Sequence, residues 1–319
     1  MLALRPLSFD LLEVAKSELN EDPRQLTSQI DVIKSWLNEC TTLSGPMQDQ
    51  VLLSFLRGCK FSLVKVKEKL SLFFWTRTIL QQVVQNRDPL DEHVLQIIRL
   101  GVGIPLPKTI NPKDPKIFVI RVAQFDTEKC SFADVIKVGT MINDILMRDD
   151  DQVVVCGMSL IIDLAKVKAA HLLQLDMEFL RHVAILYQDA SPFRMQGIHI
   201  LNPPPGMQTV LSIFKSLLSD KNQDKRILAH GSSLASLHQH FPQEILPAEY
   251  DGLLGPIQEC LDFWEAKLIN NRDYLLDMSK LRDSRADATT ESIALKPPGC
   301  SKENELFGIE GSFRKLELD

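Results

Sequence analysis

The chain has 319 residues, 45% of them hydrophobic and 24% charged, which is the composition of a globular protein large enough to bury a sizeable core. The formal net charge of −6 argues against the basic footprint of a general nucleic-acid-binding protein. The six cysteines show no CxxC pair and no Cys/His cluster at metal-ligand spacing, and the first residues lack the apolar core of a secretory signal. A reduced, cytoplasmic protein without a metal site and without a nucleic-acid partner is therefore expected.

The first part of the chain, residues 8–87, has the apolar spacing of helices. Ser8 is placed to cap a first helix, and Pro23 to open a second. Residues 50–57 predict a third helix. Ser62 can cap a long fourth helix, whose inward face carries Leu63, Val66, Leu70, Phe73 and Phe74. A helical domain over residues 1–88 is therefore expected.

From about residue 90 strands and helices alternate, which predicts an α/β domain with a mostly parallel sheet over residues 89–281. Gly101 fits the C-terminal cap of the first helix, and the acidic run 149–151 fits a solvated turn. Residues 282–319 are rich in Ser, Thr, Asp and Glu and predict a mobile tail. The expected elements are helix 91–100, strand 116–122, helix 132–147, strand 153–164, helix 172–187, strands 197–201 and 226–229, and a helix from Ser232 or Ser233.

One stretch of this domain, residues 195–214, carries no Asp, Glu, Lys or Arg. Three consecutive prolines, Pro203 to Pro205, interrupt it, so it cannot cross a bilayer as a helix. It predicts a short strand, a proline turn and a helix with one apolar face formed by Met207, Val210, Leu211, Phe214, Leu217 and Leu218. Leaving such a face in water would cost roughly 1.5 to 3 kcal/mol per large side chain. The face must therefore rest on a core, a ligand or a membrane.

The sequence contains no convincing catalytic constellation. Ser232 and Ser233 follow a strand and open a helix, but the G-x-S-x-G pattern of a hydrolase elbow is absent, and serine is an ordinary helix cap. No G-x-G-x-x-G loop or Walker loop is present, so a nucleotide cofactor lacks support. We expect no catalytic residues, and a hydrolase using Ser232 or Ser233 is the weakest of the functional hypotheses.

Five blocks of sequence occur in a specific order. The first is LLSFLRGCKFSLVKVKEKL (52–70), followed by IRVAQFD (120–126), GMSLIIDL (157–164), SPFRMQGIHILN (191–202) and HFPQEILPAEYDG (240–252). Over about residues 25–278 the chain thereby resembles the CRAL-TRIO family of lipid-transfer proteins, and within it the α-tocopherol transfer and cellular retinaldehyde-binding proteins. The resemblance implies an N-terminal helical bundle, then a mixed, mostly parallel sheet with flanking helices and a helical lid over an apolar cavity.

The resemblance also assigns residues to this cavity and its lid. The implied lining is Ile136, Met158, Leu160, Ile162, Leu186, Phe193, Ile198 and Ile200. Three of these alternate along one strand and therefore share a sheet face, although the pattern alone would equally fit core packing. The implied lid carries Met207, Val210, Leu211, Phe214 and Leu218.

A basic, phosphoinositide-binding patch near the lid is implied as well. Its candidates are Arg57, Lys60, Arg194, Lys215, Lys221, Lys225 and Arg226. Residues 193–231 hold five basic and two acidic residues, so this region is basic within an acidic chain. Gln196 and Cys59 stand where the family often has arginine, which predicts a weaker or altered head-group site.

We therefore expect a monomeric, cytoplasmic carrier that associates transiently with anionic membranes. It would bind a hydrophobic small molecule in an apolar cavity, with no other cofactor, and transfer it between membranes. The alternative is a module of the same fold that senses a lipid or tethers a protein without transferring anything. The sequence does not identify the ligand.

Overall fold

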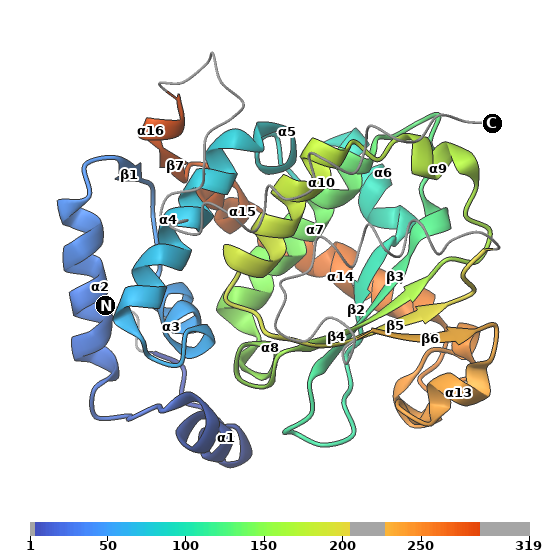
Figure 1. The fold of residues 1–319 in the computed structure, drawn as a ribbon, viewed down its shortest axis with the longest axis horizontal. Coiled ribbons are helices and arrows are strands. Elements are labelled where there is room, and N and C mark those ends of the chain that lie inside the picture. The colour runs from blue at the N-terminus through green and yellow to red at the C-terminus, as the bar shows by residue number, and fades with distance from the viewer. Residues whose placement is uncertain (1–3, 205–226, 288–319) are drawn as a thin grey trace, which may run out of the picture.

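The computed structural model describes residues 4–204 and 227–287 and places a five-stranded sheet at the centre of the protein (Figure 1). The strand order is β2-β3-β4-β5-β6; the last four strands run parallel, and β2 is antiparallel to β3. The strands are β2 (Gly103–Pro105), β3 (Lys116–Arg121), β4 (Met158–Asp163), β5 (Met195–Leu201) and β6 (Ile227–Gly231). The predicted mixed, mostly parallel sheet is confirmed.

The N-terminal region is helical, as predicted. Ser8 caps the first helix by accepting a hydrogen bond from the Leu11 amide, and Gly101 ends the last one in the left-handed conformation. The region packs on the sheet domain through α1 against α8, α3 against α7 and α8, and α5 against α7. Its helices are α1 (Phe9–Leu19), α2 (Leu26–Glu39), α3 (Asp49–Gly58), α4 (Leu63–Ile79), α5 (Gln81–Val84) and α6 (Glu92–Leu100).

The remaining helices surround the sheet. They are α7 (Phe132–Asp149), α8 (Asp151–Cys156), α9 (Ala169–Leu173), α10 (Met177–Ala184), α13 (Leu234–His238), α14 (Ile257–Asn270) and α15 (Arg272–Met278). A π-helical turn, η2 (Ile185–Asp189), continues α10, and three 3₁₀ turns, η1 (Val122–Gln124), η3 (Gln243–Ile245) and η4 (Ala248–Tyr250), complete the connections. The single helix predicted over 172–187 is divided, because Asp176 caps a new helix with its side chain.

The long apolar strand predicted over 153–164 is wrong in its first half. Asp150 accepts a hydrogen bond from the Val153 amide and opens helix α8, so residues 153–156 are helical and the strand begins at Met158. Between them Gly157 has a φ of +83°, and a Cβ there would lie 2.4 Å from the Arg194 carbonyl oxygen. Only glycine allows this close approach between α8 and β5.

The acidic run 149–151 is not a solvated turn. Asp149 pairs with Arg148 at 2.7 Å, Asp150 pairs with Lys116 at 3.2 Å, and Asp151 pairs with Arg57 at 3.1 Å. These carboxylates therefore connect α7 and α8 to the sheet and to the N-terminal helices.

The first residues of the predicted tail are folded. β7 (Arg282–Asp283) pairs antiparallel with β1 (Leu43–Ser44), and the fully buried Asp283 donates its amide to the Thr78 hydroxyl at 2.8 Å. A short helix, α16 (Ser284–Asp287), follows. Residues 282–287 thus pack beside β1 and α4, whereas residues 288–319 lie outside the described part.

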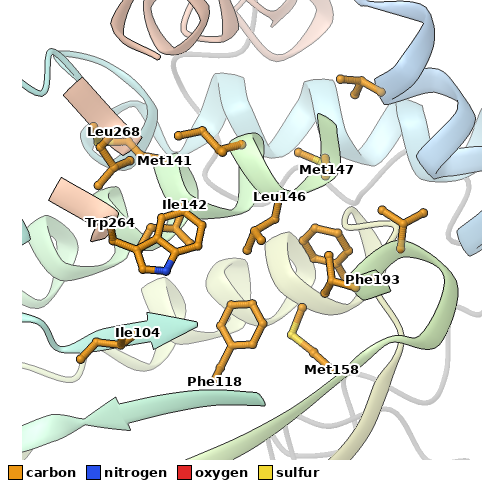
Figure 2. Close-up of a cluster of buried hydrophobic side chains, with 14 of the residues drawn as sticks. Ile104, Phe118, Met141, Ile142, Leu146, Met147, Met158, Phe193, Trp264 and Leu268 are labelled. Atoms are coloured by element: carbon orange, nitrogen blue, oxygen red, sulfur yellow. The ribbon is translucent and has the colours of Figure 1, made fainter. Parts of the chain in front are cut away.

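The two faces of the large sheet are covered differently. On one face, Phe118 of β3 and Met158 of β4 point toward Ile142 and Leu146 of α7 (Figure 2). The other face is covered by the chain around α13 and η4. There the Phe241 ring lies 4.5 Å from the ring of His199 on β5, and Tyr250 donates its hydroxyl to Asp163 at 3.2 Å.

Candidate functional site

Two rows of apolar side chains cross the strands on the α7 side of the sheet. The first row joins Phe118, Leu160, Ile198 and Ile227, and the second joins Ile120, Ile162, Ile200 and Ala229. Residues that pair in register on parallel strands project from the same face, so the rows form one continuous surface. The predicted alternation along β4 thus extends over four strands.

This surface, which we call the apolar face, is incompletely buried by the described residues. Leu160, Ile162 and Ile227 keep part of their surface accessible, whereas Val119 and Ile161 on the opposite face are 0% exposed. The apolar face packs at its rim against Val122, Leu164, Val167 and Leu172. Accessible aliphatic area of this kind is unfavourable in water, at about 25 cal/mol per Å², and favours a hydrophobic ligand.

A second apolar cluster, which we call the second wall, joins α7 to the π-helical turn η2. Ile136 of α7 and Leu186 of η2 lie in one apolar cluster with Phe179 and Tyr187, supported from behind by Leu80, Val83 and Val84. Phe132 and Phe179 meet edge to face with centroids 6.0 Å apart, which joins α7 to α10.

The eight predicted lining residues therefore fall into three groups. Leu160, Ile162, Ile198 and Ile200 share the apolar face, Ile136 and Leu186 share the second wall, and Met158 and Phe193 belong to the main core beneath α7 (Figure 2). Their assignment to a ligand cavity stays a prediction. The lid residues Met207, Val210, Leu211, Phe214 and Leu218 lie outside the described residues.

An open depression of about 460 Å³ lies where β4, β5 and β6 end. It is lined by Leu164, Ala165, Lys166, Val167, Asn202, Pro203, Pro204, Gly231 and Ser232. Leu164 and Val167 also belong to the rim of the apolar face, so the depression adjoins it. Sequence reasoning did not assign these residues, although the carboxyl ends of parallel strands are a common place for ligands.

Arg57 is not part of a surface patch, contrary to the prediction. The side chain is 2% exposed, and its guanidinium binds Glu21 through Nε at 2.9 Å and Nη2 at 3.1 Å. Nη1 binds Asp151 at 3.1 Å. With all three nitrogens paired to carboxylates, Arg57 ties α3 to α8 and to the end of α1.

The other basic candidates differ in accessibility. Lys60 is exposed, whereas Arg194 is half-buried, donates Nη2 to the Val155 carbonyl, and has a pKa lowered by burial. Gln196, at the position where the family often has arginine, donates its amide to the Cys156 carbonyl at 3.1 Å. Arg194 and Gln196 thus attach β5 to the end of α8. Lys215, Lys221, Lys225 and Arg226 lie outside the described residues.

Two family models match this chain. Residues 106–252 match the family model described as CRAL/TRIO domain, and residues 22–94 match the one described as Pinta-like, UBA domain. The chain carries a CRAL/TRIO domain. This confirms the family that the five sequence blocks predicted, which is a family of lipid-binding and lipid-transfer proteins. The boundaries 1–88, 89–281 and 282–319 stay predictions.

The similar proteins include two clavesins. Clavesin-1 of Xenopus laevis is 28% identical over 254 residues, covering 78% of this chain and 75% of its own. Clavesin-2 of Homo sapiens is 28% identical over 266 residues, covering 83% of this chain and 80% of its own. The crystal structure of Sfh5 aligns with 84% of this chain and all of its own, at 13% identity and a TM-score of 0.44, which is too distant to support a conclusion.

Residues 4–204 and 227–287 contain neither a membrane-spanning helix nor a cluster of metal ligands. No helix there is long and apolar enough to cross a membrane. No group of three His, Cys, Asp or Glu side chains there is arranged to hold a metal ion.

Among the described residues, a histidine ring contacts the hydroxyl of Ser236, which is not one of the two serines of the weakest hypothesis. Ser233 caps α13 by accepting a hydrogen bond from the Ser236 amide at 3.2 Å. The Ser236 hydroxyl lies 2.8 Å from His230 Nδ1, and His230 Nε2 lies 2.9 Å from His199 Nδ1. In a catalytic triad a carboxylate binds the second nitrogen of the histidine. Here the neutral His199 takes that place beside His230, so no described carboxylate stabilises the imidazolium that a general base would form.

Burial keeps this histidine pair uncharged. His199 and His230 are 6% and 8% exposed, and their rings stack with centroids 5.2 Å apart. Burial, with smaller contributions from His230 and His240, lowers the pKa of His199 to about 4, and burial with His240 lowers the pKa of His230. The pair therefore joins β5 and β6 of the CRAL/TRIO domain as a structural link that requires neutrality.

We predict that acid destabilises the CRAL/TRIO domain through His199. The imidazole of the unfolded chain has a pKa near 6.5. The contribution of His199 to the free energy of unfolding is therefore fully present above that pH, and it declines by on the order of 3 kcal/mol as the pH falls toward about 4. Urea unfolding followed between these pH values should show a smaller decline in His199→Gln than in the parent protein. Parallel stability curves for the two proteins would contradict this assignment.

Proposed function

We propose that this protein holds one hydrophobic molecule against the apolar face and transfers it between membranes. The observation that carries the proposal is the accessible apolar surface on β4, β5 and β6, beside a second apolar wall on α7 and η2. Membership of a lipid-binding and lipid-transfer family supports it. The protein acts as a carrier and not as an enzyme, and it needs no cofactor besides its ligand.

Residues 207–218 act as the lid in this proposal. Their apolar side chains recur at helical spacing, so one face can cover the ligand in water and enter the interface of a membrane. Docking is assisted by Lys221, Lys225 and Arg226, which follow the lid in the sequence, together with Lys215. Each basic residue near an anionic surface contributes about 1 kcal/mol.

Replacing Ile162 by asparagine should reduce lipid binding. Ile162 is partly accessible on the apolar face, so the change adds polarity there without leaving a sealed cavity. We expect about tenfold less lipid to remain with the purified protein, measured by mass spectrometry of the extracted lipids. Leu253→Asn, at a site that is 71% exposed, is the matched control and should leave the lipid content unchanged. Equal lipid in both variants would contradict the site.

The lid is tested by transfer kinetics. Phe214→Asp should slow the movement of a fluorescent lipid between donor and acceptor vesicles about tenfold, because a carboxylate opposes entry into the interface. Phe263→Asp changes an exposed phenylalanine of α14 and should leave the rate unaltered. An unchanged rate for Phe214→Asp would remove the lid from the mechanism. A parent protein that binds lipid without moving it would instead be a sensor or tether.

The basic patch is tested by membrane binding. Lys221→Ala combined with Arg226→Ala should weaken binding to phosphatidylcholine vesicles containing phosphatidylinositol bisphosphate by roughly thirtyfold in co-sedimentation. Lys129→Ala with Lys280→Ala removes the same charge from exposed positions elsewhere and is the control. If both double variants bind equally, the patch does not dock the protein.

A further inference from the structure

Two valines and a tryptophan form an exposed apolar surface on the N-terminal helices. Val32 of α2 and Val64 of α4 are 45% and 68% exposed, and Trp36 of α2 is partly exposed. Val32 and Trp36 lie one helical turn apart and therefore share a face of α2. Lys67, three residues after Val64, reaches over the Trp36 ring, with its Nζ 5.7 Å from the ring centroid. These residues thus belong to one surface, which we call the α2–α4 surface.

The start of α4 carries more positive than negative charge. Residues 60–68 hold three lysines, Lys60, Lys65 and Lys67, against one glutamate, Glu68. None of the three ammonium groups forms an ion pair with a described residue. The first turn of α4 contains no acidic residue, so the helix dipole adds to the positive potential. The α2–α4 surface therefore combines exposed apolar side chains with available lysines, a combination that suits an acidic, apolar peptide.

The described part of the chain ends close to this surface. β7 pairs with β1, which follows α2 in the sequence, and the Ser284 amide donates to the Thr42 carbonyl at 2.9 Å. The Asp283 amide donates to the hydroxyl of Thr78 in the last turn of α4, and α16 packs on the same helix (Figure 1). Asp287, the last described residue, therefore lies near the C-terminal ends of α2 and α4.

The sequence beyond Asp287 contains a matching peptide. Residues 303–310, ENELFGIE, hold three glutamates and no lysine or arginine. Their large apolar residues are Leu306, Phe307 and Ile309. Residues 288–302 can span about 50 Å when extended, whereas α4 measures about 21 Å from Thr78 back to Val64. Residues 303–310, which we call the acidic segment, can therefore reach the α2–α4 surface.

We propose that the acidic segment binds the α2–α4 surface of its own chain. Its Leu306 and Phe307 side chains cover the two exposed valines and Trp36, and its glutamates face the three lysines. The inference goes beyond the proposed function and does not depend on it, because neither the apolar face nor the second wall takes part in the contact.

Attachment to the same chain favours this occupant over a separate partner. A segment tethered by a linker of this length meets its site at an effective concentration on the order of 1 mM. Each exposed ion pair contributes little, so a surface of this kind is filled more readily by a tethered peptide than by a partner in solution. Binding also removes the apolar area of Val32 and Val64 from water.

Tryptophan fluorescence reports on this contact in the full-length protein. The chain has three tryptophans, and two of them, Trp75 and Trp264, are only 3% and 6% exposed. Acrylamide in solution therefore quenches mainly Trp36. If the acidic segment covers Trp36, the Stern–Volmer constant of the parent protein is low and rises when the segment is displaced.

Changes in the acidic segment supply the first test. Leu306→Ser with Phe307→Ser should raise the Stern–Volmer constant about twofold, because Trp36 loses its cover. Phe313→Ser with Leu316→Ser changes the same residue types outside the acidic segment and should keep the constant of the parent protein. Equal quenching of the parent protein and the first variant overturns the inference. A difference between them that persists in a Trp36→Phe background overturns it as well.

Charge reversal tests the pairing. Lys60→Glu with Lys65→Glu should raise the quenching about twofold, because like charges then face each other. Glu303→Lys with Glu305→Lys should do the same. All four changes in one chain restore opposite charges and should return the quenching of the parent protein. Lys67 is left unchanged, because it contacts the tryptophan ring. A fourfold variant that is quenched as strongly as the two double variants overturns the inference.

The same measurement distinguishes the other possible occupants. It is repeated over a wide range of protein concentration, and with vesicles that contain phosphatidylserine. The acidic segment should protect Trp36 equally at every protein concentration and without vesicles. Protection that grows with protein concentration would assign the surface to a second copy of the chain. Protection that appears only with vesicles would assign it to an anionic membrane. Either result overturns the inference.

Discussion

The buried carboxylate of Asp144 ties the N-terminal helices to α7, and the second wall of the site depends on that connection. Asp144 pairs with Arg77 of α4 and, at 2.6 Å, with Arg87, which follows α5. All three side chains are at most 2% exposed. Removing one member of such a group typically destabilises a protein by about 3 to 5 kcal/mol, because the remaining charge stays buried without compensation. The ion pairs therefore fix the distance of α7 from the sheet and its rotation about its own axis. Ile136, Gly139 and Asn143, which lie on this helix, are positioned by the same pairs.

A second buried arginine makes a similar arrangement just beyond the C-terminal end of α7. Arg57 of α3 joins Glu21 to Asp151, so buried arginines connect the helices before residue 92 to the sheet domain at two places, in addition to a shared apolar core. The CRAL/TRIO match begins only at residue 106, yet Lys69, Arg77 and Arg87 all precede it. The proposed ligand site therefore depends on residues that precede the CRAL/TRIO match. A fragment that begins at residue 106 would lose the contacts that hold η2 and α7.

The sequence predicted what depends on local pattern and missed what depends on distant contacts. Strand β3, helix α7 and the shared face of Leu160 and Ile162 follow from periodicity, and all are observed. Residues 153–155 are three valines, an apolar run that fits a strand or a buried helix equally, and the hydrogen bond from the Val153 amide to Asp150 selects the helix. Arg57 was counted as surface charge because a sequence does not show that Glu21 and Asp151 converge on it. The meeting of Tyr187 with Gly139 joins residues far apart in the chain, and no single-sequence signal indicates it.

The contacts of residues 185–201 limit how a ligand can leave. Lys69 holds the carbonyls at the end of η2, and Arg194 and Gln196 hold the start of β5 against the carbonyls of α8. Five hydrogen bonds thus fasten the segment that carries Leu186, Tyr187, Phe193 and Ile198, and three of them come from the ammonium group of the half-buried Lys69. Release of a ligand by displacing this wall would break these bonds together. In the proposed carrier, exchange of the ligand at lower cost would leave this segment in place.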